Sequence, residues 1–161
     1  MKFLIGLLIT STLLFAASEK LIIDAKNFET DDIKGLTTFT GDVKLKKVKD
    51  RLNSDKLEIY MKPKEEGKSR QASKYVATGN ADLEIHTNGK IYIGKGKKII
   101  YIPEKQEYTV LGNGYLKEIT ESRELFGEKI LINQLTGSAK VNGSENKPVR
   151  FIINIESDGK K

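Results

Sequence analysis

The side chains that most often carry out chemistry in proteins are scarce in this sequence. His86 is the only histidine, and there is no cysteine. A Ser-His-Asp arrangement would therefore have to use His86, and neither a histidine-rich nor a thiolate metal site can form. In an alternating strand His86 falls on the face opposite to Leu83 and Ile85. We expect it to be a solvated side chain outside the apolar interior.

The remaining candidates for chemistry are carboxylate pairs and one glycine–lysine run. Asp31-Asp32 and Glu65-Glu66 are adjacent in sequence, so on strands or turns their side chains point apart. Carboxylates from distant segments could still meet in the fold, as glycoside hydrolysis requires, and that alternative stays open. Gly94-Lys95-Gly96-Lys97 is not a phosphate loop, because no helix pattern and no G-K-[ST] follows it. The sequence therefore favours a binding protein over an enzyme, with no cofactor and no metal.

The N-terminal segment has the composition of a secretion signal. Lys2 precedes an uncharged run from Phe3 to Phe15, and the small residues Ala16-Ala17-Ser18 follow. This order is typical of a signal peptide, and cleavage after Ser18 places small residues where the peptidase requires them. The run is shorter than the roughly 20 apolar residues of a spanning helix, although a retained anchor remains the alternative. We predict a cleaved signal at 1–18, one folded domain at 19–156 and a flexible tail at 157–161.

The charge of the chain is basic, with a formal net value of +6. Lysine supplies nearly all of it, whereas base-edge readout in nucleic acids favours the planar guanidinium of arginine. We therefore expect no nucleic-acid partner. Scattered lysines are typical of a solvated face or of protected sheet edges, and they are compatible with an anionic lipid surface or a phosphorylated sugar. The four arginines are Arg51, Arg70, Arg123 and Arg150.

Short runs of alternating apolar and polar residues predict β-strands rather than helices. Such runs occupy 43–46, 56–59, 82–86, 90–93 and 149–155. Thr87-Asn88-Gly89 lies between two of them and is typical of a tight hairpin turn. The polar stretch 64–73 predicts a loop. We therefore expect an all-β domain.

The sequence also contains an internal repeat, in which a lysine-containing strand, a turn and a second strand ending in glycine recur. The four copies span 25–41, 55–79, 97–112 and 128–143, and an acidic or amide residue follows the glycine in the first three. Hairpins with one apolar face cannot bury that face alone. Stacking them predicts a folded-over sheet with a seam and two exposed ends.

The repeated segments Phe39-Thr40-Gly41-Asp42-Val43-Lys44-Leu45 and Ser54-Asp55-Lys56-Leu57-Glu58-Ile59-Tyr60 resemble the LptA/OstA-like family of periplasmic lipopolysaccharide-transport proteins. The similarity extends over 21–155. It implies a twisted, half-open antiparallel β-jellyroll in the periplasm. It also implies a groove for the lipid A acyl chains of lipopolysaccharide, passed from the inner to the outer membrane. The implied partners are inner- and outer-membrane transport components of the same fold and further copies stacked head to tail.

Three alternatives remain open: a membrane-anchored sister component of the same pathway, another periplasmic lipid chaperone, and a structural envelope protein without cargo. Apolar residues expected on the inner face are candidate lipid contacts, although the same residues would also form a plain core. These candidates are Val43, Leu45, Leu57, Ile59, Leu83, Ile85, Ile91, Ile93, Ile99, Phe151 and Ile153.

The two ends of the predicted sheet are candidate assembly sites. The terminal strands of an unclosed sheet present unpaired N–H and C=O groups that another strand can complete. The alternative is that both terminal runs are internal strands that are paired within the chain. The candidate edge residues are Leu21, Ile22 and Ile23 at one end, with Phe151, Ile153 and Ile155 at the other.

Overall fold

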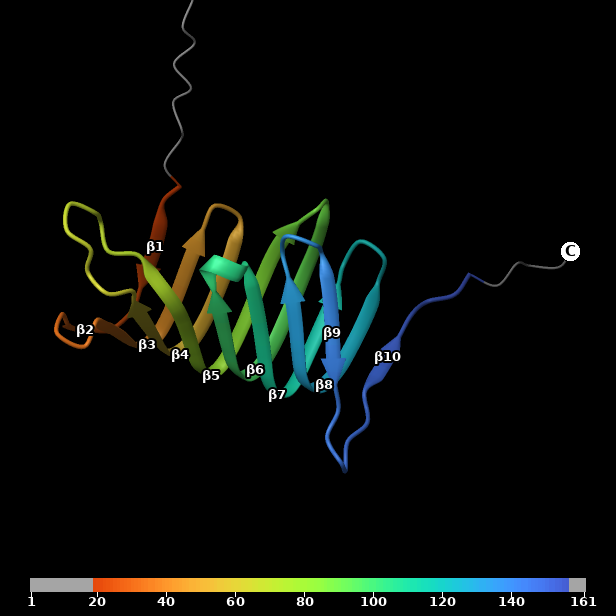
Figure 1. The fold of residues 1–161 in the computed structure, drawn as a ribbon. Helices are drawn as coiled ribbons and strands as arrows, with labels where there is room; N and C mark the ends of the chain where they lie inside the picture. Colours follow the sequence, from red (N-terminus) through yellow and green to blue (C-terminus); the bar gives the residue numbers. More distant parts are fainter. Residues whose placement is uncertain (1–18, 157–161) are drawn as a thin grey trace, which may run out of the picture.

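Ten strands form one continuous antiparallel sheet in the computed structural model, which describes residues 19–156 (Figure 1). The protein is all-β, and within the described range no helix has the length and hydropathy needed to cross a bilayer. The predicted signal at 1–18 and tail at 157–161 lie outside the described residues. The strands are β1 (Leu21–Asp24), β2 (Asn27–Asp31), β3 (Leu36–Lys47), β4 (Asp50–Met61), β5 (Ala72–Thr87), β6 (Lys90–Ile102), β7 (Glu107–Glu118), β8 (Arg123–Asn133), β9 (Ser138–Asn142) and β10 (Arg150–Ile152), with one 3₁₀ turn, η1 (Pro103–Lys105), between β6 and β7.

The six long strands β3 to β8 form a meander in which each strand pairs with the next in sequence. Two short strands share each outer edge. β1 and β2 pair with opposite halves of β3, and β10 and β9 pair with opposite halves of β8. These two ends of the sheet lie far apart (Figure 1). The sheet is therefore unclosed, as the repeat predicts.

Each long strand bends near its middle, where the strand ladders lose register. On β3, β5 and β7 the bend holds Gly41-Asp42, Gly79-Asn80 and Gly112-Asn113, and all six residues have positive φ. Two consecutive left-handed residues require glycine and tolerate Asp or Asn, which explains the repeated dipeptide. The prediction that the glycine ends a strand is wrong for these three copies, because the strand continues beyond it.

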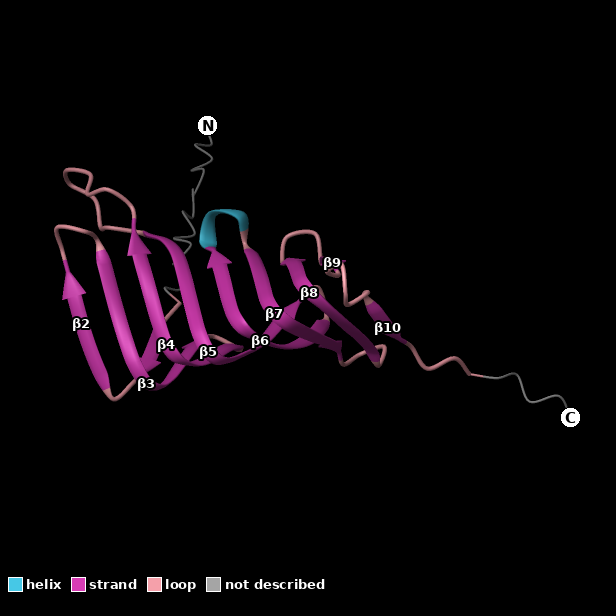
Figure 2. Ribbon diagram, turned by 90° about the horizontal axis from the view of Figure 1, so that it is seen from below, coloured by secondary structure: helices cyan, strands magenta, loops and turns pink. Residues whose placement is uncertain are grey.

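The bends divide the sheet into two layers (Figure 2). We call the layer that ends at the turns 48–49, 88–89 and 119–122 the first leaf, and it includes β1 and β10. The second leaf ends at the turns 32–35, 62–71, 103–106 and 134–137, and it includes β2 and β9. The line along which the turns of the two leaves approach each other is called the seam.

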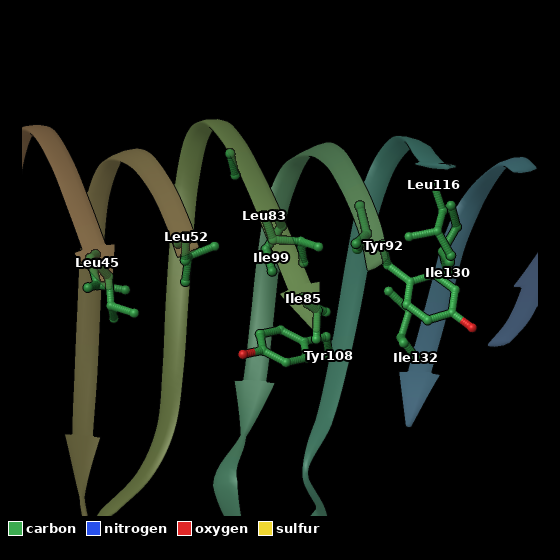
Figure 3. Packing of buried hydrophobic residues seen from close by; sticks show 14 of the residues in the cluster. Leu45, Leu52, Leu83, Ile85, Tyr92, Ile99, Tyr108, Leu116, Ile130 and Ile132 are labelled. Carbon is green, nitrogen blue, oxygen red and sulfur yellow. The ribbon is translucent and has the colours of Figure 1, made fainter. Parts of the chain in front are cut away.

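The core lies between the leaves. On the first leaf Leu45, Leu52 and Leu83 are directly aligned across neighbouring strands. On the second leaf Ala77, Ile99 and Val110 are aligned in the same way. Each large aliphatic side chain buried here contributes about 1.5–3 kcal/mol relative to exposure. Figure 3 shows side chains from both rows among the labelled core residues. The fully buried large side chains are Val43, Leu57, Leu83, Ile85, Ile99, Val110, Leu116, Ile130 and Ile132.

Most of the predicted local elements are confirmed. The turn at Asn88-Gly89 joins β5 to β6, and both residues have positive φ, as a two-residue hairpin requires. The loop predicted at 64–73 lies two residues earlier, at 62–71, between β4 and β5. The predicted C-terminal strand is shorter than expected, because β10 ends at Ile152 and the described residues after it form no strand.

Candidate functional site

The seam is open beside the N-terminal half of the sheet, where it forms an apolar cleft of about 150 Å³. This volume is smaller than the roughly 300–1,000 Å³ of a complete small-molecule site, so the cleft is a local opening of the seam above the apolar interior. We call it the seam cleft. The first leaf contributes Leu21, Leu45 and Leu52 to its lining, and the second leaf contributes three tyrosines and Pro103.

Three tyrosines form the wall of the seam cleft on the second leaf. Tyr75, Tyr101 and Tyr108 are directly opposite one another on β5, β6 and β7. The ring centroids of Tyr101 and Tyr108 are 4.3 Å apart in a stacked arrangement, and those of Tyr75 and Tyr101 are 5.9 Å apart. Burial raises the pKa of all three phenols, most strongly that of Tyr108. The wall is therefore neutral at physiological pH and presents aromatic faces to the cleft.

Charged residues stand at the rim of the seam cleft on the first leaf. Lys47, Asp50 and Arg51 belong to the lining. The Lys47 Nζ atom is 3.3 Å from Glu19 Oε2, and Arg51 forms an ion pair with Glu84. The cleft therefore combines an apolar interior with a polar mouth, which is the arrangement that an amphipathic ligand requires.

The turn at 134–137 bridges the seam beyond the cleft. Thr87 Oγ1 donates to the carbonyl oxygen of Gln134 at 2.8 Å, and Gln134 Nε2 donates to Asp50 Oδ2 at 3.1 Å. The Tyr92 hydroxyl donates to the Gly137 carbonyl at 3.4 Å. These hydrogen bonds hold the two leaves together over the C-terminal half of the seam, next to the open cleft.

Seven of the predicted lipid contacts lie on the inner face and are buried: Val43, Leu45, Leu57, Ile59, Leu83, Ile85 and Ile99. Among these seven, Leu45 is the one that lines the seam cleft, and the other six belong to the core between the leaves. Burial alone does not separate a lipid contact from a core residue, so their role in binding stays a prediction.

The prediction that Ile91 and Ile93 face inward is wrong. Ile91 is opposite His86 and Ile93 is opposite Glu84, on the outer face of the first leaf. The two-residue turn before β6 places Tyr92 opposite the inward Ile85, so Tyr92 is the buried residue of this run. The two-residue turn at Asn88-Gly89 determines which residues of β5 and β6 are opposite each other, so it already predicts that Tyr92 faces inward.

The outer face also holds the single histidine, as its alternation predicts. His86 Nε2 is 2.8 Å from Glu84 Oε1. The hydrogen bonds from His86 and Arg51 lower the pKa of Glu84. The described residues 19–156 bring no three His, Cys, Asp or Glu side chains together into a metal-binding group.

The predicted edge residues lie at the two ends of the sheet. Among the described residues 19–156, β1 and β10 terminate the strand order, and each is paired within the chain along one edge only. Phe151 is opposite Leu125 and continues an inner-face row, yet its side chain is 53% exposed because no strand follows. Ile153 and Ile155 lie beyond β10, and Ile155 is 84% exposed. Leu21 and Ile22 are exposed on β1, and Ile23 is half-buried.

The sequence analysis missed the tyrosine wall and Leu52. Tyr75 alternates with Ala77, and Tyr108 alternates with Val110, so the period of two was present in both segments. Alternation predicts which face of the sheet a side chain is on. It does not predict which turns of the two leaves approach each other, and this approach decides which inward residues line the seam cleft.

Comparison with known proteins finds one matching family model, described as LptA/(LptD N-terminal domain) LPS transport protein, over residues 22–146. Curated protein sequences give no match. Among solved structures, the chain is similar to LptH of Pseudomonas aeruginosa, described as the LptA homologous periplasmic component of the lipopolysaccharide transport device. The TM-score is 0.73 at 15% sequence identity, and the alignment covers 85% of this chain and 96% of that one. At this identity the likeness establishes a common fold.

Proposed function

This chain belongs to the family of LptA and LptD N-terminal domain proteins of lipopolysaccharide transport, and on that basis we propose that it carries lipopolysaccharide through the periplasm. The acyl chains lie in the seam cleft and the apolar interior beside it. The observation that carries this proposal is the apolar cleft, lined by leucines and neutral tyrosines, at the open seam of an unclosed sheet. The proposed mature protein begins at residue 19.

The energetics of such a groove favour a lipid. Each methylene removed from water contributes about 0.8 kcal/mol, so a chain of about a dozen carbons gains on the order of 10 kcal/mol. The six long strands, spaced at about 4.8 Å, extend the apolar interior over roughly 24 Å along the seam. The sugar and phosphate groups remain in water at the seam. Transport then requires no reaction, only successive apolar sites of similar affinity.

The bridging role rests on the two ends of the sheet. β1 and β10 both belong to the first leaf and both have a free edge. In the proposed assembly β10 of one copy pairs with β1 of the next, which extends the sheet and its groove. This contact is heterologous and generates an open filament. The same edges would dock the inner- and outer-membrane components that share the fold.

Photo-crosslinking to lipopolysaccharide tests the proposed cargo site. A photoreactive residue is placed at Leu45 or Tyr101, which line the seam cleft, and at Ile93 on the outer face as the matched control. We expect crosslinks at the first two positions and none at Ile93. Equal labelling at the three positions, or no labelling under conditions in which an established carrier is labelled, would exclude the seam cleft as the cargo site. Absence of any copurifying lipid would then favour a structural envelope protein.

A further inference from the structure

The hairpin that joins β3 to β4 concentrates positive charge beside the seam cleft. Residues 44–51, which we call the basic hairpin, contain five cationic side chains and one acidic side chain. All five cationic residues are exposed. They are Lys44, Lys46, Lys47, Lys49 and Arg51.

The strand register connects this charge to the apolar cleft. Leu45 and Leu52 are directly opposite each other and line the cleft. Lys47 is on the same face as Leu45, two residues nearer the turn, and also belongs to the lining. One hairpin therefore places apolar side chains inside the cleft and the ammonium group of Lys47 at its mouth.

The rim of the seam cleft on the second leaf, at η1, has no comparable excess of positive charge. Pro103 of η1 lines the cleft there, and the neighbouring Glu104 forms an ion pair with Lys62 at 3.3 Å. The same turn also contains Lys105, so it has one acidic and one basic side chain, whereas residues 44–51 have five basic side chains and one acidic side chain. An anionic group above the cleft is therefore attracted more strongly by the first leaf. The cleft is electrostatically asymmetric.

The basic hairpin has cationic groups available for a ligand. Lys44 is 3.3 Å from Asp42 and Lys47 is 3.3 Å from Glu19, in exposed pairs of the kind that contribute little to stability. No salt bridge among the described residues 19–156 involves Lys46 or Lys49. Lysine binds phosphate as a mobile point charge.

We propose that the basic hairpin binds a phosphate group on the head of the acylated cargo while the acyl chains occupy the seam cleft. This inference rests on the proposed function and adds a direction to it, because the headgroup is held at the end of the groove nearest β1. The ligand class is a phosphorylated, acylated glycolipid. Free phosphate shares the charge but not the acyl chains.

The test measures the affinity of the full chain for a lipid A that carries phosphates and for the same lipid with its phosphates removed, at one ionic strength. The double variant Lys46→Glu/Lys49→Glu, at two exposed residues outside the lining of the cleft, is compared with Lys95→Glu/Lys98→Glu, which changes the net charge equally on exposed residues near the bend of β6. We expect wild type and the control variant to prefer the phosphorylated lipid by on the order of tenfold. The hairpin variant should lose that preference and keep its affinity for the lipid without phosphates.

Each contrary outcome has a distinct meaning. Binding of both lipids with equal affinity by wild type would overturn phosphate recognition and leave the carrier function intact. Equal losses in the two double variants would attribute the preference to net charge and overturn the assignment to the hairpin. Binding of neither lipid would refute the carrier function and the inference with it. Inorganic phosphate alone should compete only weakly, and competition as strong as that of the lipid would make this a free-phosphate site.

Discussion

Replacing Gly112 with alanine should destabilise the protein strongly, because Gly112 occupies the bend of β7 with φ +78°. A left-handed conformation costs an L-residue about 1–2 kcal/mol. An alanine Cβ would also stand 2.9 Å from the Cβ of Lys97, an atom that moves only with the β6 backbone. Strain and contact together should lower the free energy of unfolding by roughly 2–4 kcal/mol.

Gly67 provides the matched control. Its φ is +73°, yet an added Cβ would meet no atom within 4 Å. Gly67→Ala therefore tests strain without the contact and should cost roughly 1–2 kcal/mol. The difference between the two variants isolates the close approach of neighbouring strands at the bend.

Urea denaturation followed by circular dichroism measures both free energies, and thermal unfolding gives a second estimate. At about 3 °C per kcal/mol for a domain of this size, Gly112→Ala should lower the melting temperature by roughly 6–12 °C. If Gly112→Ala costs no more than Gly67→Ala, the glycine of the repeated dipeptide is not required for the approach of β6 to the bend. The physical explanation of the repeat would then be wrong.

Three further predictions test the faces, the tyrosine wall and the seam. Ile85→Ala should cost about 2–5 kcal/mol in urea denaturation and the outward Ile91→Ala about 1 kcal/mol or less, whereas equal costs would contradict the assignment of faces. Burial raises the pKa of Tyr108 above its ordinary value of 10, so the stability contributed by the neutral phenol is complete below pH 10 and is lost as the pH rises above it. Wild type should lose stability there more steeply than Tyr108→Phe, and parallel pH profiles would refute this explanation. Gln134→Ala should cost about 1 kcal/mol and accelerate amide hydrogen exchange in the turn 134–137, and unchanged exchange would show that this side chain does not hold the leaves together.

The repeat predicts the unclosed sheet but not the position of the bend within each strand. A bent strand has two alternating runs, and from sequence these are indistinguishable from two separate strands. Thr78-Gly79 therefore resembles the end of a hairpin although β5 continues to Thr87. The signal that distinguishes the two cases is the Gly-Asx dipeptide, because two successive positive φ values are compatible with a bend inside a strand.

The error at Ile91 and Ile93 has a related cause. Ile91 and Ile93 are both an even number of residues away from Ile99, which is buried. An unbroken period of two would therefore place all three side chains on the same face. The ladder between β6 and β7 shifts register between Lys95 and Lys98, and this irregularity changes the phase of alternation within one strand. A period of two is reliable only between such shifts. The location of the seam cleft requires the three-dimensional arrangement, since its lining comes from strands on both leaves.

The meander also determines how the chain can fold. Each long strand pairs with its neighbours in sequence, so every pairing step closes a short loop with a small entropy cost. Local pairing of this kind favours rapid, stepwise growth over the slow capture of distant segments. Each of the long strands β4 to β8 can be added to the edge left by the strand before it, and β9 and β10 then share the outer edge of β8. The outer edge of β10 is of the same kind as the edges on which the long strands were added.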